Sequence, residues 1–205
     1  EPGAQISAGC NLAAGSQIGS QVTLAPNVVI GRDVRLYGEV HLGQNVIIGQ
    51  NCSLFGPLQI DEAVVIAPHV QIGSSLGART RIRLASRIGC RSVIMGGVSI
   101  GQNSFIRSNS HVIGDVPDYA LVSGDPAFLE DYVCSRCASR FSVVRSSPNH
   151  LMVYLQCRNC GLPVFTMSSA NFLPRIAHVL LPGQTPGQVV NLTGHSYTWV
   201  DVYEM

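Results

Sequence analysis

An aliphatic residue recurs at every sixth position through the first half of this chain. Self-similarity at a short fixed period is typical of folds made of stacked repeat units, because each unit buries its apolar side chain against the next. The repeat falls into two runs, and the four-residue step from Ile72 to Leu76 between them predicts one hexad that is two residues short. The runs are Ile6, Leu12, Ile18, Leu24, Ile30, Leu36, Leu42, Ile48, Leu54, Ile60, Ile66 and Ile72, then Leu76, Ile82, Ile88, Ile94, Ile100, Ile106 and Val112.

A small or β-branched residue stands four positions after most of these aliphatic residues, as at Cys10, Val28 and Cys52. Glycine often follows the aliphatic residue directly, as at Gly31. We interpret each hexad as one short strand and one corner. The aliphatic residues form one inward-pointing column along the stack, and the small residues four positions later form a second. Glycine or asparagine is expected at corners that need an unusual φ. Three hexads close a coil of about eighteen residues, so the pattern predicts a left-handed parallel β-helix of about six coils stacked ~4.8 Å apart. Cys10 and Cys52 are expected in its core, and Cys90, which lies off this column, in a turn.

Charged residues make up only 12% of the chain, about half of the ~25% that is usual in soluble proteins. The net charge of +1 argues against a general nucleic-acid binder. No apolar run approaches the ~20 residues of a membrane span. The chain starts at Glu1 rather than Met and shows no secretory signal, which is compatible with removal of an upstream segment.

Four of the seven cysteines form two Cys-x-x-Cys pairs, Cys134 with Cys137 and Cys157 with Cys160. Two such knuckles supply four thiolates for a tetrahedral, closed and therefore structural Zn²⁺ site. Strand-like stretches at 141–144 and 151–155 between the knuckles predict a zinc ribbon over 131–168. Cysteine used for metal binding rather than for disulfides indicates a reducing compartment, and we expect a cytoplasmic protein. A β-rich tail is expected over 169–205.

Residues 99–128 resemble the closing coils of the hexapeptide-repeat acyltransferases. The resemblance rests on Asp115-Val116-Pro117-Asp118-Tyr119 followed by Gly124-Asp125-Pro126-Ala127, and with the repeats it covers 6–128. It implies a homotrimer that binds acetyl-CoA or another acyl-CoA along its C-terminal coils at the subunit interface, beside Gly124, Asp125, Pro126 and Ala127. The chain departs from the family pattern at Asp125, where Asn is usual, and at Phe128, where a basic residue is usual. The cysteine-rich segment that follows is similar in layout to sugar N-acetyltransferases acting on UDP-linked amino sugars.

Arginine supplies all thirteen basic residues, and five of them fall between Arg79 and Arg91. We predict that Arg81 and Arg87, with Arg107 further along, contact the phosphates of the acyl donor. The alternative is a solvated or intersubunit surface on which these guanidinium groups pair with carboxylates.

Acyl transfer to a hydroxyl needs a general base, whereas transfer to a neutral amine needs less assistance. His69 is the first candidate for such a base and His111 the second; either could instead be a surface or interface residue. A zinc site of the carbonic anhydrase type is disfavoured, because His41, His69 and His111 are 28 and 42 positions apart and do not fall on one face.

The predicted organisation is a β-helix over 1–116, an exit segment over 117–130, the zinc ribbon over 131–168 and the tail over 169–205. The predicted function is acyl-CoA-dependent acyl transfer at a trimer interface, with N-acetylation of an amino sugar or another small amine. The alternative is a non-catalytic β-helix scaffold whose zinc ribbon or tail docks on a protein partner. The sequence leaves open whether the chain is an enzyme.

Overall fold

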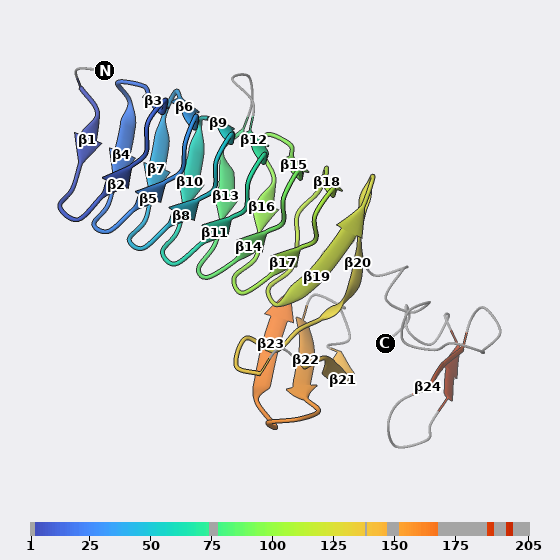
Figure 1. Ribbon diagram of the computed structural model, residues 1–205. Coiled ribbons are helices and arrows are strands. Elements are labelled where there is room, and N and C mark those ends of the chain that lie inside the picture. The colour runs from blue at the N-terminus through green and yellow to red at the C-terminus, as the bar shows by residue number, and fades with distance from the viewer. Residues whose placement is uncertain are drawn as a thin grey trace.

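The structure is a computed structural model. The coils form a three-sided prism that is followed by a hairpin and a small antiparallel module (Figure 1). The described residues contain only strands, turns and bends, so they include no helix that could cross a bilayer. These residues are 3–73, 78–137, 139–146, 152–167, 188–190 and 196–198.

Three parallel sheets form the sides of the prism, which confirms the predicted left-handed β-helix of about six coils. Sheet A contains β1 (Gln5–Ile6), β4 (Val22–Leu24), β7 (Val40–Leu42), β10 (Leu58–Ile60), β13 (Thr80–Ile82) and β16 (Ser99–Ile100). Sheet B contains β2 (Asn11–Leu12), β5 (Val29–Ile30), β8 (Ile47–Ile48), β11 (Val65–Ile66), β14 (Arg87–Ile88) and β17 (Phe105–Ile106), then β19 (Ala120–Gly124) and β20 (Ala127–Tyr132). Sheet C contains β3 (Gln17–Ile18), β6 (Arg35–Tyr37), β9 (Ser53–Phe55), β12 (Gln71–Gly73), β15 (Val93–Ile94) and β18 (His111–Val112).

The interruption of the repeat is an insertion, not a shortened hexad. Ile48 pairs with Ile66 eighteen positions later, but Ile66 pairs with Ile88, twenty-two positions later. One coil therefore carries four extra residues between β12 and β13, and the regular spacing returns where Ile88 pairs with Ile106. The predicted short hexad is wrong, because Leu76 happens to match the aliphatic pattern; Leu76 itself lies outside the described residues.

The two inward columns are buried from Val22 onward, whereas Ile6 and Leu12 at the open N-terminal end of the stack are exposed. The second column changes character along the axis. Before the insertion it holds mostly apolar residues, including the fully buried Cys52, while Cys10 is half-buried. After the insertion it holds mostly buried hydroxyl residues, with Val98 as an apolar member. The Ser86 hydroxyl oxygen lies 2.7 Å from the carbonyl oxygens of both Arg83 and Gly101, either of which can accept its hydrogen bond. The later coils are thus joined through their interior by hydrogen bonds, which the buried hydroxyl groups require. The hydroxyl residues are Thr80, Ser86, Ser92, Ser104 and Ser110.

The left-handed corner position and the glycine that directly follows the aliphatic residue serve different purposes. The residue three positions after the aliphatic residue adopts the left-handed backbone conformation, as at Asn27 (φ 61°) and Asn45 (φ 57°). Asparagine tolerates this conformation well. The glycine directly after the aliphatic residue allows close contact between coils instead. A Cβ on Gly101 would lie 2.4 Å from the backbone nitrogen of Asp118 in the next coil. The expectation that these glycines satisfy an unusual φ is therefore wrong for most of them.

Gly101→Ala should consequently destabilise the later coils by about 1–3 kcal/mol, because the added methyl group overlaps backbone atoms that cannot rotate away. Urea unfolding followed by circular dichroism measures the effect. Ala25→Gly is the matched control at the equivalent position of an earlier coil and should cost no more than about 1 kcal/mol. Equal losses in both variants would contradict the steric explanation.

The chain leaves the prism through the β19–β20 hairpin, whose first strand continues sheet B beside β17. A second antiparallel sheet follows, made of β21 (Phe141–Ser146), β22 (Met152–Cys157) and β23 (Pro163–Met167). The rings of Phe141 and Tyr119 pack edge-to-face, with their centroids 5.9 Å apart, and this contact attaches the module to the last coil. The tail contributes β24 (Gln188–Val190) and β25 (Ser196–Thr198), and most of the predicted 169–205 region lies outside the described residues.

Candidate functional site

The turn of the exit hairpin brings Asp125 to His111 on the last coil. Asp125 lies between β19 and β20, and His111 points outward from β18. The Nδ1 atom of His111 is 3.0 Å from Oδ1 of Asp125, and the His111 side chain is 37% exposed. A carboxylate on one ring nitrogen orients the imidazole and leaves Nε2 available for proton transfer.

The neighbouring cation Arg107 is already paired. Its Nε donates to Oε2 of Glu130 at 2.8 Å, and the other oxygen of Glu130 accepts from the Ser123 hydroxyl. Half of the Arg107 side chain remains exposed, so it can still reach a ligand at the same corner. Glu130 reduces the net positive charge that Arg107 offers there.

The arginines from Arg79 to Arg91 run around one coil instead of lining one face. Arg81 points outward from sheet A at β13, whereas Arg87 points outward from sheet B at β14. Arg79 pairs with Glu39, and Arg83 donates to Asp118 at 3.2 Å. Within one chain the structure therefore does not bring Arg81, Arg87 and Arg107 together.

His69, the first candidate for a base, occupies the corner between sheets B and C. Its φ is 63°, its side chain is exposed, and its backbone N–H donates to the carbonyl of Gln50 at 2.9 Å. Residues 69, 91 and 109 occupy equivalent corners, so His69 lies two coils, or roughly 10 Å along the axis, before the coil of His111. The structure does not bring His69 to the His111–Asp125 pair.

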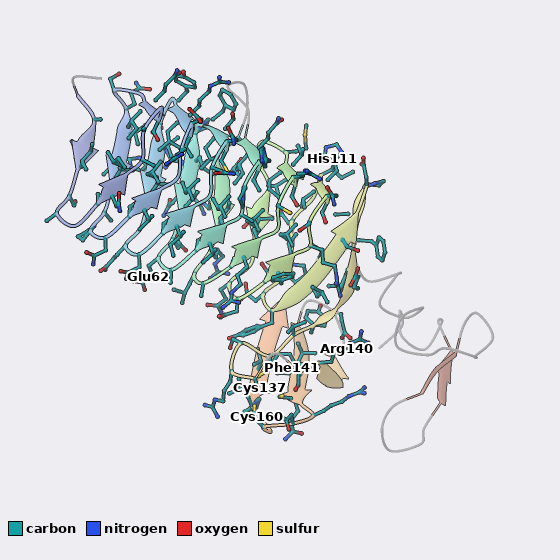
Figure 2. All side chains as sticks on the ribbon, in the orientation of Figure 1. Glu62, His111, Cys137, Arg140, Phe141 and Cys160 are labelled. Atoms are coloured by element: carbon teal, nitrogen blue, oxygen red, sulfur yellow. The ribbon has the colours of Figure 1, made fainter. Side chains whose placement is uncertain are left out.

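The four cysteines of the two knuckles converge at one end of the antiparallel module. Their Sγ atoms all lie within 4.8 Å of one another, with Cys134 and Cys160 at 3.7 Å and Cys137 and Cys157 at 3.4 Å. Four sulfur ligands at ~2.3 Å from a tetrahedral metal would be ~3.8 Å apart, so the cluster fits such an ion. Figure 2 shows Cys137 and Cys160 well away from His111. This centre is separate from the His111–Asp125 pair.

The surroundings of Cys137 favour the thiolate that a metal site needs. The hydroxyl and backbone amide of Ser139, together with the nearby Cys157 thiol, lower the pKa of Cys137 to about 6. A thiolate at neutral pH is the form that binds a cation. Because the four sulfur atoms also converge, they are a suitable ligand set for a structural metal ion.

The sequence predicts Asp125 beside the acyl donor and His111 as the second candidate for a base, but it does not predict that the two side chains meet. The missing information was the hairpin, because fourteen positions separate the two residues and only the tight turn after Gly124 brings them together. The sequence feature that could have indicated the pair is the aspartate at position 125 in place of the usual asparagine, because a carboxylate near a histidine can orient the imidazole.

The coiled fold is shared with solved structures of an N-acyltransferase. A variant of the N-acyltransferase AntD from Bacillus cereus in complex with dTDP and coenzyme A superposes with a TM-score of 0.59 at 18% identity, covering 64% of this chain and 86% of that one. AntD with dTDP and 3-hydroxybutyryl-CoA gives a TM-score of 0.52, also at 18% identity, with coverage of 56% and 75%. These likenesses establish the fold.

One curated relative is similar in sequence. It is a dTDP-3-amino-3,6-dideoxy-alpha-D-galactopyranose 3-N-acetyltransferase from Aneurinibacillus thermoaerophilus, 39% identical over 66 residues, or 32% of this chain. The match spans 34% of that relative's length. No protein-family model matches the chain.

Proposed function

We propose that this protein is an acyl-CoA-dependent N-acyltransferase that acylates an amino sugar, and that His111 is its general base. The observation that carries the proposal is the 3.0 Å contact between His111 and Asp125, located where the acyltransferase-like coils end. The relative that acetylates a dTDP-linked amino sugar supports the acceptor class. The AntD complexes with coenzyme A and dTDP, on the same fold, support the donor.

In this reaction the amine nitrogen of the acceptor attacks the thioester carbonyl. A C–N bond forms, the C–S bond breaks, and coenzyme A leaves as the thiolate. His111 Nε2 takes the proton that the nitrogen loses and returns it to the thiolate, while Asp125 holds Nδ1 and stabilises the imidazolium. Because an amine is already nucleophilic, positioning supplies much of the rate, and the rigid coil provides it.

For the donor we propose contacts with Gly124, Asp125, Pro126 and Ala127 at the hairpin turn, together with Arg107. Arg81 and Arg87 point from adjacent sides of the prism, so a donor held between two subunits could contact one arginine from each chain. This geometry favours a homotrimer in which the donor lies between neighbouring chains. His69 is retained as the alternative base, to be compared directly with His111.

We propose that the four-cysteine cluster holds a structural Zn²⁺, forming a zinc ribbon over 131–168. Bound zinc would fix the two knuckles in one arrangement and stabilise the module. The module and the tail beyond it are the proposed surface for a protein partner. The seven free cysteines fit a reducing compartment, and we propose the cytoplasm.

Isothermal titration with acetyl-CoA and with CoA tests the proposed function. We expect dissociation constants in or below the micromolar range for wild-type protein, weakened by Arg107→Ala because the guanidinium lies at the corner beside the hairpin. Arg32→Ala, which changes an exposed arginine on an early coil, is the matched control and should bind normally. No heat of binding up to about 1 mM donor would contradict the enzyme proposal and favour the non-catalytic scaffold.

A further inference from the structure

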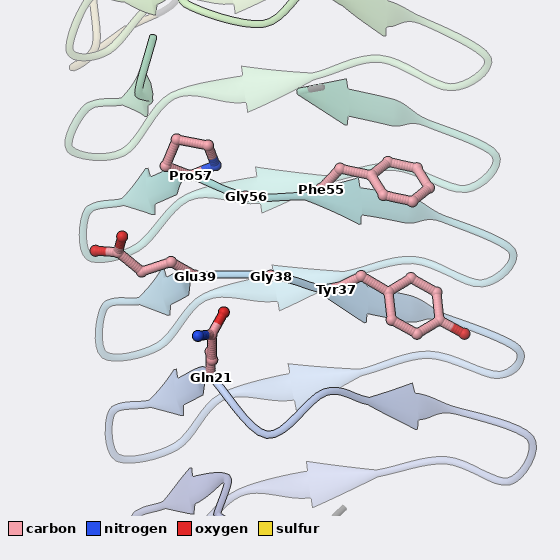
Figure 3. A pocket seen from close by; sticks show the side chains of 7 residues that line it. All are labelled: Gln21, Tyr37, Gly38, Glu39, Phe55, Gly56 and Pro57. Carbon is pink, nitrogen blue, oxygen red and sulfur yellow. The ribbon is translucent and has the colours of Figure 1, made fainter. Parts of the chain in front are cut away.

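A groove lies along the edge between sheets C and A, on the coils that precede the insertion. It is an open groove with a volume of about 330 Å³. Figure 3 shows its two walls, with Tyr37 and Phe55 on one side and Glu39 and Pro57 on the other. The lining residues are Gln21, Tyr37, Gly38, Glu39, Phe55, Gly56 and Pro57.

The aromatic wall is one continuous surface. The rings of Tyr37 and Phe55 occupy equivalent positions on successive coils, with centroids 6.0 Å apart and planes inclined by 27°. The Tyr37 hydroxyl donates to Oε1 of Gln17, which holds the ring in place. Tyr37 is 37% exposed although it has a large apolar face. Such a surface suits the C–H face of a ring-shaped ligand.

The floor of the groove exists because two glycines are aligned. Gly38 and Gly56 stand at equivalent positions, and a Cβ on Gly38 would lie 3.5 Å from the backbone of Gly56. The backbone of Gly38 has φ 76°, a conformation that asparagine also tolerates. A side chain at position 38 would therefore occupy the groove without preventing the turn.

The opposite wall is polar but electrically balanced. Glu39, Pro57 and Arg79 occupy the same position on three successive coils, so the Arg79 side chain passes over Pro57 to reach Oε1 of Glu39. His41 Nε2 lies 3.3 Å from the same oxygen. Hydrogen bonds from Arg79 and then His41 lower the pKa of Glu39, so its carboxylate is ionised at neutral pH. Because Arg79 offsets this charge, the wall offers hydrogen bonds without a net field that would select a phosphate or a cation.

We propose that this groove is a binding site for the ring of a neutral hexopyranose. The apolar face of the sugar would lie against Tyr37 and Phe55, and its hydroxyl groups would bond to Glu39 and Gln21 across the glycine floor. Four coil steps separate the sheet C strand of Tyr37 from that of His111, a distance of roughly 19 Å along the axis. The groove is thus a second site, and its occupancy does not depend on the acyl-transfer proposal.

Saturation-transfer NMR on the whole chain, without acyl donor, tests the site. The probes are methyl α-D-glucopyranoside, methyl β-D-galactopyranoside, N-acetylglucosamine and maltohexaose, each at about 10 mM, because dissociation constants on the order of 1 mM are expected. We expect signal from at least one probe. Binding of a monosaccharide indicates a site for one ring, and binding of maltohexaose alone indicates a site for a longer glycan.

Tyr37→Ala and Gly38→Asn should each reduce the signal by about fivefold or more, the first by removing the aromatic wall and the second by filling the floor. Tyr37→Phe keeps the ring and should bind, which separates loss of the platform from loss of folding. Phe105→Ala removes an exposed aromatic ring on sheet B and is the matched control. The proposal is overturned if wild-type protein gives no signal with any probe. It is equally overturned if Tyr37→Ala and Gly38→Asn bind like wild type, or if Phe105→Ala abolishes binding to the same extent.

Discussion

We expect Cys157→Ser to abolish metal binding and to unfold the antiparallel module while the coils stay folded. The four sulfur atoms within 4.8 Å of one another are the main organising feature of this module, which is too small to bury a large apolar core. Zinc contributes about 10–16 kcal/mol to comparable small domains, more than such a module can supply from packing alone. Elemental analysis should find one zinc per chain in the wild-type protein and none in the variant. The backbone amides of β21 and β22 should lose their protection from hydrogen exchange in the variant.

Cys90→Ser is the matched control, since this thiol lies on the coil near Ser108, outside the cluster. It should retain one zinc per chain and full protection of the module. Treatment of wild-type protein with a strong chelator should reproduce the Cys157→Ser result. A module that keeps its protection after complete loss of metal would show that its packing suffices and would contradict the proposed structural role.

His111→Gln should lower kcat for acyl transfer by about 100-fold or more, with little change in the affinity for CoA. The amide side chain can occupy the position of the ring but cannot take a proton from the acceptor. Asp125→Asn should lower kcat by a smaller factor, because it removes the charge that stabilises the imidazolium at 3.0 Å. Steady-state kinetics with acetyl-CoA and an amino-sugar nucleotide measure both effects, with the reaction monitored through the free thiol of the released CoA.

His41→Gln is a suitable control, because this histidine contacts Glu39 several coils away. His69→Gln discriminates between the two candidate bases. A large loss of kcat in His69→Gln with normal turnover in His111→Gln would move the role of base to His69. Loss of CoA affinity in His111→Gln would instead indicate a binding role for His111.

The six-residue period was sufficient to predict the coils because each hexad is stabilised by its equivalent in the next coil. It could not show the length of the insertion, since Leu76 matches the aliphatic pattern by chance and only the pairing of Ile66 with Ile88 reveals four added residues. The same period places residues 81 and 87, six positions apart, on adjacent sides of the prism. Arg81 and Arg87 therefore stay predicted donor contacts that lie on adjacent sides of one chain.

The candidate sites differed in how far sequence could predict them. The Cys-x-x-Cys spacing predicted the convergence of four thiols, because each knuckle brings two sulfur atoms together locally. The pairing of His111 with Asp125 depends on a hairpin turn, and the groove depends on which corner residues become aligned on successive coils. Both are products of tertiary register, which a single local motif does not encode.

The hydroxyl column of the later coils limits how this protein can change during evolution. Before the insertion, inward Val28, Val34 and Val46 are interchangeable, so a whole coil could be duplicated or deleted there and still stack. After the insertion, Ser92 and Ser110 both donate to the carbonyl of Arg107, so neighbouring coils share one acceptor. Removing one of these coils would break a shared hydrogen-bond pair and displace the exit hairpin. Changes in coil number should therefore accumulate in the first half of the stack, where they leave the His111 end in place.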